Sequence, residues 1–388
     1  MQNSKRASTK CLSMVHEYEK YVNLSTQWNR WLLKPMGAWP LLPNISRAEK
    51  CFNWQINAVC YGLISFLFIP CGLYVMLEVE DLYSKIKLFG PLIFCVMAYL
   101  KYYSLIFHGN DIRECLDRIE WDWKNVKHLE DRDIMVATAN FGRRVGTIAV
   151  VDENLTFIPM VFPFSRLLVD TRQSPANEIL FTIQMLGGVL IHGIAAAGCS
   201  LAAVFAMHAC GQMKVLMCLL DNLITGRSDI PKSVDGRIAN IVSQHVRILK
   251  FLALIEKAMS EISLIEVSGC TLDMCLVGYY IIVEWNSKDM TATVTYTIIL
   301  ASLTFNIFIF CYIGELVAEQ CKMVGERSYM IEWHRLPGKK RLSLVLIIAM
   351  SNATIKLTAG NLIKLSLDSF SSVIKTSVAF LNMLRTLT

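Results

Sequence analysis

Long apolar runs without charged residues divide the 388-residue chain. A helix needs about 20 apolar residues to cross the hydrocarbon core of a bilayer. Four runs meet this length: residues 51–77, 88–107, 179–207 and 290–314, with Lys101 as the single charge among them. Because the chain is 54% hydrophobic and only 18% charged, it fits a multi-pass membrane protein better than a soluble domain.

Three further segments are less favourable as membrane-spanning helices. Residues 262–283 are apolar but carry Glu266 and Asp273, seven positions apart on one helix face. For these two acids we expect salt-bridged packing rather than a cation path. The apolar run of residues 342–355 is too short to span a bilayer easily. Residues 367–387 are long enough to span it but are polar.

The segments between the runs alternate in their content of Lys and Arg. The counts are 8 in residues 1–50, 2 in 78–87, 7 in 108–144, 2 in 145–177, 7 in 209–261, 1 in 285–289 and 6 in 319–341. Segments rich in Lys and Arg stay in the cytoplasm. The pattern predicts an all-α, polytopic protein with seven transmembrane helices, a cytoplasmic N-terminus and an extracellular C-terminus.

The third crossing required by this alternation is short. Its apolar part covers only residues 145–151, and Asp152 and Glu153 follow at once. Extending it to residue 168 would bury both acids, at roughly 2.5–3.5 kcal/mol each near the helix centre. Starting at residue 134 would instead bury Arg143 and Arg144. The sequence alone leaves open where this third crossing begins and ends.

Several kinds of chemistry have no support in the sequence. We find no nucleophile–base pair, phosphate-binding loop or metal-ligand spacing, so we expect no catalytic residues, metal, cofactor or enzymatic activity. The basic residues lie in loops between apolar runs, which argues against nucleic acid as a partner. The 13 cysteines form no disulfide framework. Asp131-Arg132-Asp133 is interpreted as a solvated loop, and Asn154, in Asn-Leu-Thr, is a candidate for glycosylation.

Spaced motifs in the C-terminal part resemble the signature of insect odorant receptors. They are YMIEWHRLP (329–337), KLTAG (356–360) and SLDSFSSVIKTSVAFLNMLR (366–385). Upstream segments resemble the receptors of ants and other Hymenoptera, so that the similarity covers nearly the whole chain: LKPMGAWP (33–40), CSLAAVFAMHACGQ (199–212) and FNIFIFCYIGELVAEQC (305–321). Members of this family carry a full third helix and a longer second outer loop. The resemblance therefore implies that a few tens of residues are missing here and that the third helix is truncated.

The resemblance implies a tuning subunit of an odorant-gated cation channel in the plasma membrane of olfactory sensory neuron dendrites. Its partners would be membrane lipids, a small volatile or cuticular lipid, and the odorant receptor co-receptor in a heterotetramer. The implied domains are a cytoplasmic N-terminal segment (1–50), helices 1–6 with a ligand-binding outer half (51–318), a cytoplasmic anchor with the first half of helix 7 (319–366), and a pore-lining second half of helix 7 (367–388).

The last helix carries a polar stripe that fits this pore. Ser371, Lys375, Ala379, Asn382 and Thr386 share one helix face. Such a stripe is tolerated at membrane depth when it faces protein or water. Periodicity alone leaves open whether it packs against its own subunit. In the family four subunits meet around a pore lined by this helix, and the resemblance therefore implies that the stripe lines it, with Asn382 at the narrow gate.

Candidate ligand contacts are aromatic, soft or small residues on the second, fourth, fifth and sixth spans. They are Tyr99, Tyr103, Met185, Gly188, His192, Tyr279, Tyr280 and Tyr296. Aromatic residues near helix ends also form interface belts. For His192, a structural interhelical role is favoured over a proton switch.

Two other functions stay open. The chain could be a truncated, non-functional or regulatory variant of such a receptor. It could also be a metabotropic seven-helix chemoreceptor, for which an N-terminus exposed outside the cell would be the discriminating observation.

Overall fold

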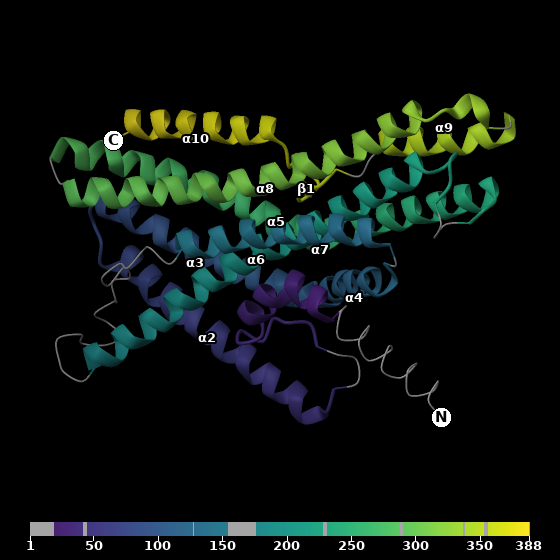
Figure 1. Ribbon diagram of the computed structural model, residues 1–388. Helices are drawn as coiled ribbons and strands as arrows, with labels where there is room; N and C mark the ends of the chain where they lie inside the picture. The colour runs from purple at the N-terminus through teal and green to yellow at the C-terminus, as the bar shows by residue number, and fades with distance from the viewer. Residues whose placement is uncertain are drawn as a thin grey trace.

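The chain folds almost entirely into helices. The computed structural model describes residues 19–41, 45–126, 128–153, 176–227, 231–287, 290–336, 338–352 and 356–387 (Figure 1). Residues 19–33 are helical, and the further helices are α2 (Arg47–Leu77), α3 (Leu82–Phe107), α4 (Gly109–Asn125), α5 (Leu129–Glu153), α6 (Ala176–Asp221), α7 (Val234–Ser287), α8 (Met290–Met330), α9 (Gly338–Asn352) and α10 (Leu367–Leu387). The predicted all-α class is confirmed.

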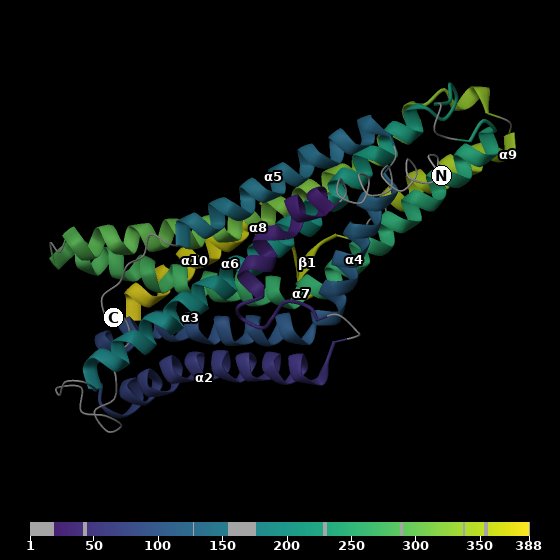
Figure 2. The same ribbon diagram turned by 60° about the horizontal axis from the view of Figure 1, so that its bottom comes forward.

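The short elements stand near the C-terminus. A 3-10 turn, η1 (Trp333–Arg335), separates α8 from α9. Strands β1 (Thr358–Ala359) and β2 (Ile363–Lys364) form an antiparallel hairpin between α9 and α10. In both views α9 and α10 lie at opposite ends of α8, and α10 runs along it (Figures 1 and 2).

Four helices are long and apolar enough to span a membrane. They are Arg47–Leu77, Tyr83–Phe107, Ile179–Asp221 and Met290–Met330. These helices contain the four clear runs predicted from the sequence. Among the described residues, α7 is not one of these four helices, and it is the helix that carries Glu266 and Asp273.

Helices α6, α7 and α8 are much longer than a bilayer requires. They contain 46, 54 and 41 residues, or about 70, 80 and 60 Å at 1.5 Å per residue. A hydrocarbon core is only about 30 Å thick. Much of the sequence assigned to loops at residues 209–261 and 319–341 is therefore helical, and these extensions pack with one another and with α9 (Figure 2).

The third helix starts earlier than either interpretation of the sequence allowed. Helix α5 begins at Leu129 and includes both Arg143 and Arg144. It packs along α6, where Gly142 brings the two backbones close, because a Cβ at that position would lie 3.1 Å from Met207. Residues 154–175, which hold the rest of the predicted third crossing and Asn154, lie outside the described residues. The truncation itself stays a prediction.

The Asp131-Arg132-Asp133 triplet is not a solvated loop. It lies in the first turns of α5, where Asp131 is 6% exposed. Both oxygens of Asp131 accept hydrogen bonds from the Arg227 guanidinium, at 3.1 and 2.8 Å. A bidentate pair of this kind holds the start of α5 against the residues that follow α6.

The centre of the bundle contains a buried ion pair. Lys101 of α3 is 2% exposed, Glu266 of α7 is 1% exposed, and the Lys101 ammonium contacts the Glu266 carboxylate. Asn306 of α8 donates to the same carboxylate and accepts a hydrogen bond from the Cys199 thiol of α6 at 2.7 Å. The expected salt-bridged packing is confirmed for Glu266. Among the described residues Asp273 has no ion pair, so for Asp273 the expectation is wrong.

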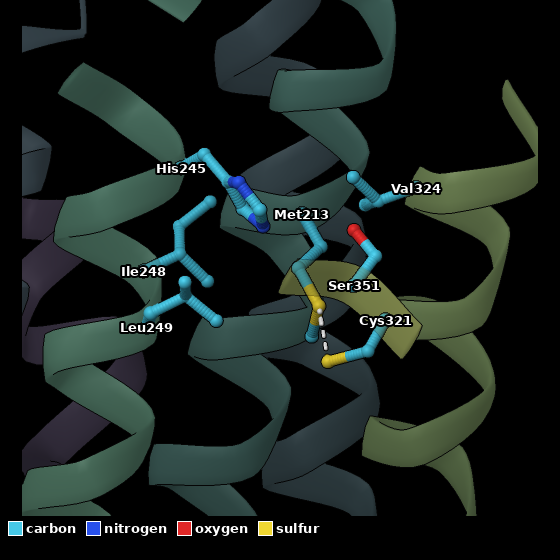
Figure 3. Close-up of a pocket in the computed structure, with 7 residues that line it drawn as sticks. All are labelled: Met213, His245, Ile248, Leu249, Cys321, Val324 and Ser351. Carbon is cyan, nitrogen blue, oxygen red and sulfur yellow. Dashed lines mark hydrogen bonds between the residues drawn. The ribbon is translucent and has the colours of Figure 1, made fainter. Parts of the chain in front are cut away.

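A small cavity lies among the long extensions (Figure 3). Its volume is about 10 Å³, room for roughly one water molecule. Its lining is Met213, His245, Ile248, Leu249, Cys321, Val324 and Ser351, and the Cys321 thiol lies 3.3 Å from the Met213 sulfur. Burial lowers the pKa of His245, which keeps this imidazole neutral at pH 7.

The entry to α10 is fixed by the β1–β2 hairpin and by α8. The Thr358 backbone N–H donates to Glu256 at 2.9 Å, and the Gly360 N–H donates to the Ser260 carbonyl at 2.9 Å. Gly360 has φ +62°, a conformation that glycine adopts without strain. Gly314 of α8 lies against the chain just before α10, because a Cβ there would lie 2.9 Å from the Leu365 carbonyl carbon.

We predict that Lys101→Met lowers the stability of the protein by about 3–5 kcal/mol, because the Glu266 charge would remain buried without its partner. Lys322→Met is the matched control, since it breaks an exposed pair with Glu326 worth about 1 kcal/mol or less. The measurement is loss of monodisperse protein on heating in detergent. Adding Glu266→Gln to Lys101→Met should recover part of the loss. Equal melting of the two single variants would contradict the prediction.

We predict that Gly314→Ala displaces the start of α10 and costs about 1–3 kcal/mol, because the new methyl group meets backbone that cannot rotate away. Gly62→Ala in α2 is the control, since nothing lies within 4 Å of its Cβ position and helix propensity favours alanine by up to about 1 kcal/mol. Thermal stability and protease cleavage between residues 356 and 366 are the measurements. A Gly314→Ala protein as stable and as resistant as Gly62→Ala would refute this.

Candidate ligand site and pore helix

Helix α10 buries one face and exposes the other. Val373 and Ser377 are 8% and 5% exposed, and the Ser377 hydroxyl donates to the Thr271 carbonyl of α7 at 3.3 Å. The five residues of the predicted polar stripe all have exposed side chains: Ser371, Lys375, Ala379, Asn382 and Thr386. The stripe therefore does not pack within its own chain. That it lines a pore stays a prediction, as does the place of Asn382 at a gate.

Helix α10 starts with a local cap. The Ser366 hydroxyl accepts a hydrogen bond from the Ser369 N–H at 3.2 Å, and the Leu367 N–H donates to Glu315 of α8 at 3.2 Å. These groups satisfy N–H donors that a first helical turn leaves free. Since Glu315 lies one residue after Gly314, the same turn of α8 contacts the chain before α10 and caps its first turn.

Tyrosine rings gather where α7 turns into α8, beside the start of α3. The rings of Tyr279 and Tyr280 lie 5.6 Å apart, and Tyr280 and Tyr296 lie 5.4 Å apart. Tyr83 of α3 completes the group at 6.2 Å from Tyr280. We call Tyr83, Tyr279, Tyr280 and Tyr296 the tyrosine cluster. The structure thus brings three predicted ligand contacts together and adds Tyr83.

Charged groups close the cluster on one side. The Tyr83 hydroxyl donates to Glu284 at 3.1 Å, and the Lys87 ammonium lies 3.3 Å from the same carboxylate. Glu284 is only 8% exposed. Sequence reasoning missed these residues because Tyr83 and Lys87 precede the apolar part of α3 and Glu284 follows that of α7. One sequence signal could have identified them: Tyr83 and Lys87 lie four residues apart, which is about one helical turn.

The other predicted ligand contacts lie apart from the tyrosine cluster. Tyr99 is 43% exposed and packs on Tyr61 of α2, with ring centres 5.1 Å apart. Tyr103 is 53% exposed and stacks on Phe107 of its own helix. This exposure is typical of aromatic residues that form a belt at the membrane–water interface. Their contact with a ligand stays a prediction.

Met185, Gly188 and His192 lie on one stretch of α6. The His192 ring nitrogen lies 2.8 Å from the Gly188 carbonyl, and its ring contacts Phe94 of α3 at 5.2 Å. The imidazole thus has a partner within its own helix and a neighbour on α3, in agreement with the structural role favoured for it. Ligand contact at these three positions is untested.

A second small cavity lies between α6, α7, α8 and the hairpin. Its volume is about 10 Å³, and Glu256, Phe310 and Thr358 are among its lining residues. No predicted ligand contact lines this cavity or the one in Figure 3. Neither has room for an odorant-sized molecule. Within the described residues, no group of three or more His, Cys, Asp and Glu side chains could hold a metal ion.

The sequence is similar to those of known odorant receptors. The family model described as 7tm Odorant receptor matches residues 81–378. Odorant receptor 82a of Drosophila melanogaster is 24% identical over 230 residues, which cover 59% of this chain and 57% of that protein. Odorant receptor 10 of Aedes albopictus is 22% identical over 252 residues, which cover 61% and 64%. The chain thus aligns with about three fifths of the length of these relatives.

The fold is similar to that of a solved olfactory receptor structure. The insect olfactory receptor OR5 from Machilis hrabei in complex with eugenol has a TM-score of 0.78 and 14% identity, covering 97% of this chain and 100% of that chain. A second structure of the same receptor gives a TM-score of 0.76. At this identity the likeness shows the fold alone.

These matches are to receptors, which confirms that the chain is not an enzyme. The motifs at residues 329–337, 356–360 and 366–385 pointed to the same family. Because the family model covers more than half of the 388 residues, the chain belongs to the 7tm odorant receptor family of insects.

Proposed function

We propose that the chain is a tuning subunit of an odorant-gated cation channel. It would assemble as a heterotetramer with the odorant receptor co-receptor in the plasma membrane of sensory neuron dendrites. The observation that carries the proposal is the polar stripe of α10, whose five side chains are all exposed in a single chain. Exposed serine, lysine, asparagine and threonine side chains at membrane depth need water or protein beside them.

The position of α10 also supports this proposal. Its buried face packs on α7 and α8, so the exposed face is the one available to other subunits or to a water-filled path (Figure 1). Membership of the family supports a shared pore. A small aromatic ligand, eugenol, is bound by the similarly folded OR5, and a small volatile or cuticular lipid is the ligand class we propose here.

Co-expression with the co-receptor in a cell that lacks odorant receptors tests this function. We expect cation current evoked by members of a broad odour panel, absent when the co-receptor is expressed alone. Surface labelling must show that the chain reaches the plasma membrane. A delivered chain without any evoked current would overturn the proposal and favour the truncated, non-functional or regulatory variant.

Sequencing of the native transcript across residues 143–159 separates two versions of that alternative. An additional apolar stretch would mean that this sequence is a shortened version of an ordinary receptor. A transcript without it would mean that the short apolar part of α5 is followed directly by Asp152 and Glu153 in the native protein.

We predict that cysteines placed on the exposed stripe react with a positively charged methanethiosulfonate in the open channel and reduce its current. Ser371→Cys, Ala379→Cys and Thr386→Cys are the test variants. Val373→Cys and Ser377→Cys, on the buried face, are the controls and should resist modification because α7 covers them. Equal reactivity on both faces, after subtraction of the wild-type background, would show that the stripe does not line the pore.

The orientation is part of the proposal. Counting Lys and Arg favours a cytoplasmic N-terminus and an extracellular C-terminus. Epitope tags on intact cells should be accessible at the C-terminus and protected at the N-terminus. The reverse result would favour the metabotropic alternative.

A further inference from the structure

Three soft metal donors line the cavity between the helical extensions. They are the Met213 thioether of α6, the His245 imidazole of α7 and the Cys321 thiol of α8, which enter the same space from three helices (Figure 3). All three residues are buried, at 2%, 6% and 4% exposed. Because the third donor is a methionine, the cluster does not count among groups of three His, Cys, Asp and Glu side chains.

The two sulfur atoms lie close to the separation that one metal ion would impose. The Cys321 thiol is 3.3 Å from the Met213 sulfur. With metal–sulfur bonds of about 2.3 Å and a tetrahedral angle, two sulfur ligands are about 3.8 Å apart. The Met213 side chain has three rotatable bonds and can supply this difference of about half an ångström.

The size of the cavity and the state of its imidazole also suit an ion. A volume of about 10 Å³ admits an ion or a water molecule but no organic ligand. Burial lowers the pKa of His245, so that at pH 7 the ring is neutral and keeps a nitrogen lone pair for a metal.

We propose that Met213, His245 and Cys321 bind one copper(I) ion. On binding, the Cys321 thiol releases its proton to solvent and the thiolate sulfur bonds to the ion. The Met213 sulfur and one His245 ring nitrogen complete a three-coordinate site. Thiolate and thioether ligands select copper(I), and imidazole suits copper as well. The ion connects α6, α7 and α8 outside their membrane-spanning parts.

Charge distinguishes copper(I) from other metal ions at this site. One thiolate balances one positive charge, so the buried site stays neutral, whereas Zn²⁺ would leave a positive charge uncompensated. Ca²⁺ and Mg²⁺ take several oxygen ligands. Among the described side chains that line the cavity, the Ser351 hydroxyl is the one oxygen donor.

The rest of the lining is hydrocarbon, from Ile248, Leu249 and Val324. The hydrophobic shell of a metal site controls solvent access and redox potential. An apolar wall around soft ligands favours copper(I) over copper(II), because copper(II) carries a further charge that this site does not balance.

The test is titration of the purified full-length chain with copper(I) against the chelator bathocuproine disulfonate, under argon with ascorbate as reductant. Cys11 and Cys51 are first replaced by serine, because Cys51 is exposed on α2 and Cys11 lies outside the described residues. We expect this parent chain to retain one copper(I) ion. Its melting temperature should rise, because an ion that binds only the folded state stabilises it.

Removal of one donor should weaken binding. Loss of an outer partner weakens metal binding about 10- to 100-fold, so loss of a direct ligand should raise the dissociation constant about tenfold or more. Met213→Leu conserves volume and Cys321→Ser changes one atom, so we expect both variants to fold. Met323→Leu is the matched control. It removes a thioether that is 40% exposed on the same helix as Cys321, and it should leave the affinity unchanged.

X-ray absorption at the copper edge identifies the ligands. We expect two sulfur neighbours and one nitrogen neighbour in the parent chain, and one sulfur fewer in Met213→Leu. A parent chain that retains no copper(I) would show that the cavity holds water only, and the proposal would be wrong.

Three other outcomes would also overturn the proposal. They are unchanged affinity in both Met213→Leu and Cys321→Ser, zinc(II) binding as tight as that of copper(I), and sulfur neighbours without nitrogen. The measurement needs no current, so a channel that fails to open would refute the proposed function without deciding this site.

Discussion

The ion pair between Lys101 and Glu266 is the interaction on which the rest of the bundle depends. Both groups are almost completely buried, and each is the ion-pair partner that balances the charge of the other. Since Asn306 and Cys199 continue the network, one charge pair fixes α3, α6, α7 and α8 relative to one another. Asp273, a further two turns along α7, is 4% exposed with one carboxylate oxygen unpartnered. Buried polar groups such as Glu266 and Asp273 are costly in a membrane. They lie in the part of α7 that contacts α10.

Helix α7 is the common scaffold of the features described above. From one end to the other it carries the hairpin contacts of Glu256 and Ser260, the ion pair at Glu266, the Thr271 contact with α10, and the tyrosine cluster at Tyr279 and Tyr280. Helix α10 packs against α7, with contacts at Thr271 and Gly278. One continuous helix therefore connects the hairpin, the ion pair and the tyrosine cluster to α10.

The sequence predicted most of the fold because a membrane leaves few choices. Backbone groups in hydrocarbon must pair internally, so an apolar run of sufficient length becomes a helix. The spans at 51–77, 88–107, 179–207 and 290–314 all lie within observed helices, and residues 367–387 form α10 at its predicted limits. The extensions of α6, α7 and α8 could not be predicted from hydropathy, because hydropathy does not identify helical segments that continue outside the membrane. The prediction for Asp131 was wrong because its partner, Arg227, is 96 residues away in the sequence.

The ligand contacts could be predicted only in part, because a site depends on which helices meet. Three tyrosines near the ends of α7 and α8 were identified from their type and position, and they do form one cluster. Tyr83 could not be found in this way, because its place is set by the packing of α3 on α7. Tyr99 and Tyr103 share the residue type but point to other faces of α3.

The polar stripe of α10 shows how far periodicity alone can go. Spacing placed Ser371, Lys375, Ala379, Asn382 and Thr386 on one face, but only the fold decides whether that face is covered. Val373 and Ser377 bury the opposite side, so the stripe is exposed in a single chain. A lone subunit thus presents to the membrane a face that lipid does not solvate well. In the assembly that we propose, other subunits or a water-filled path would cover this face, and that cost would give an isolated chain a reason to associate.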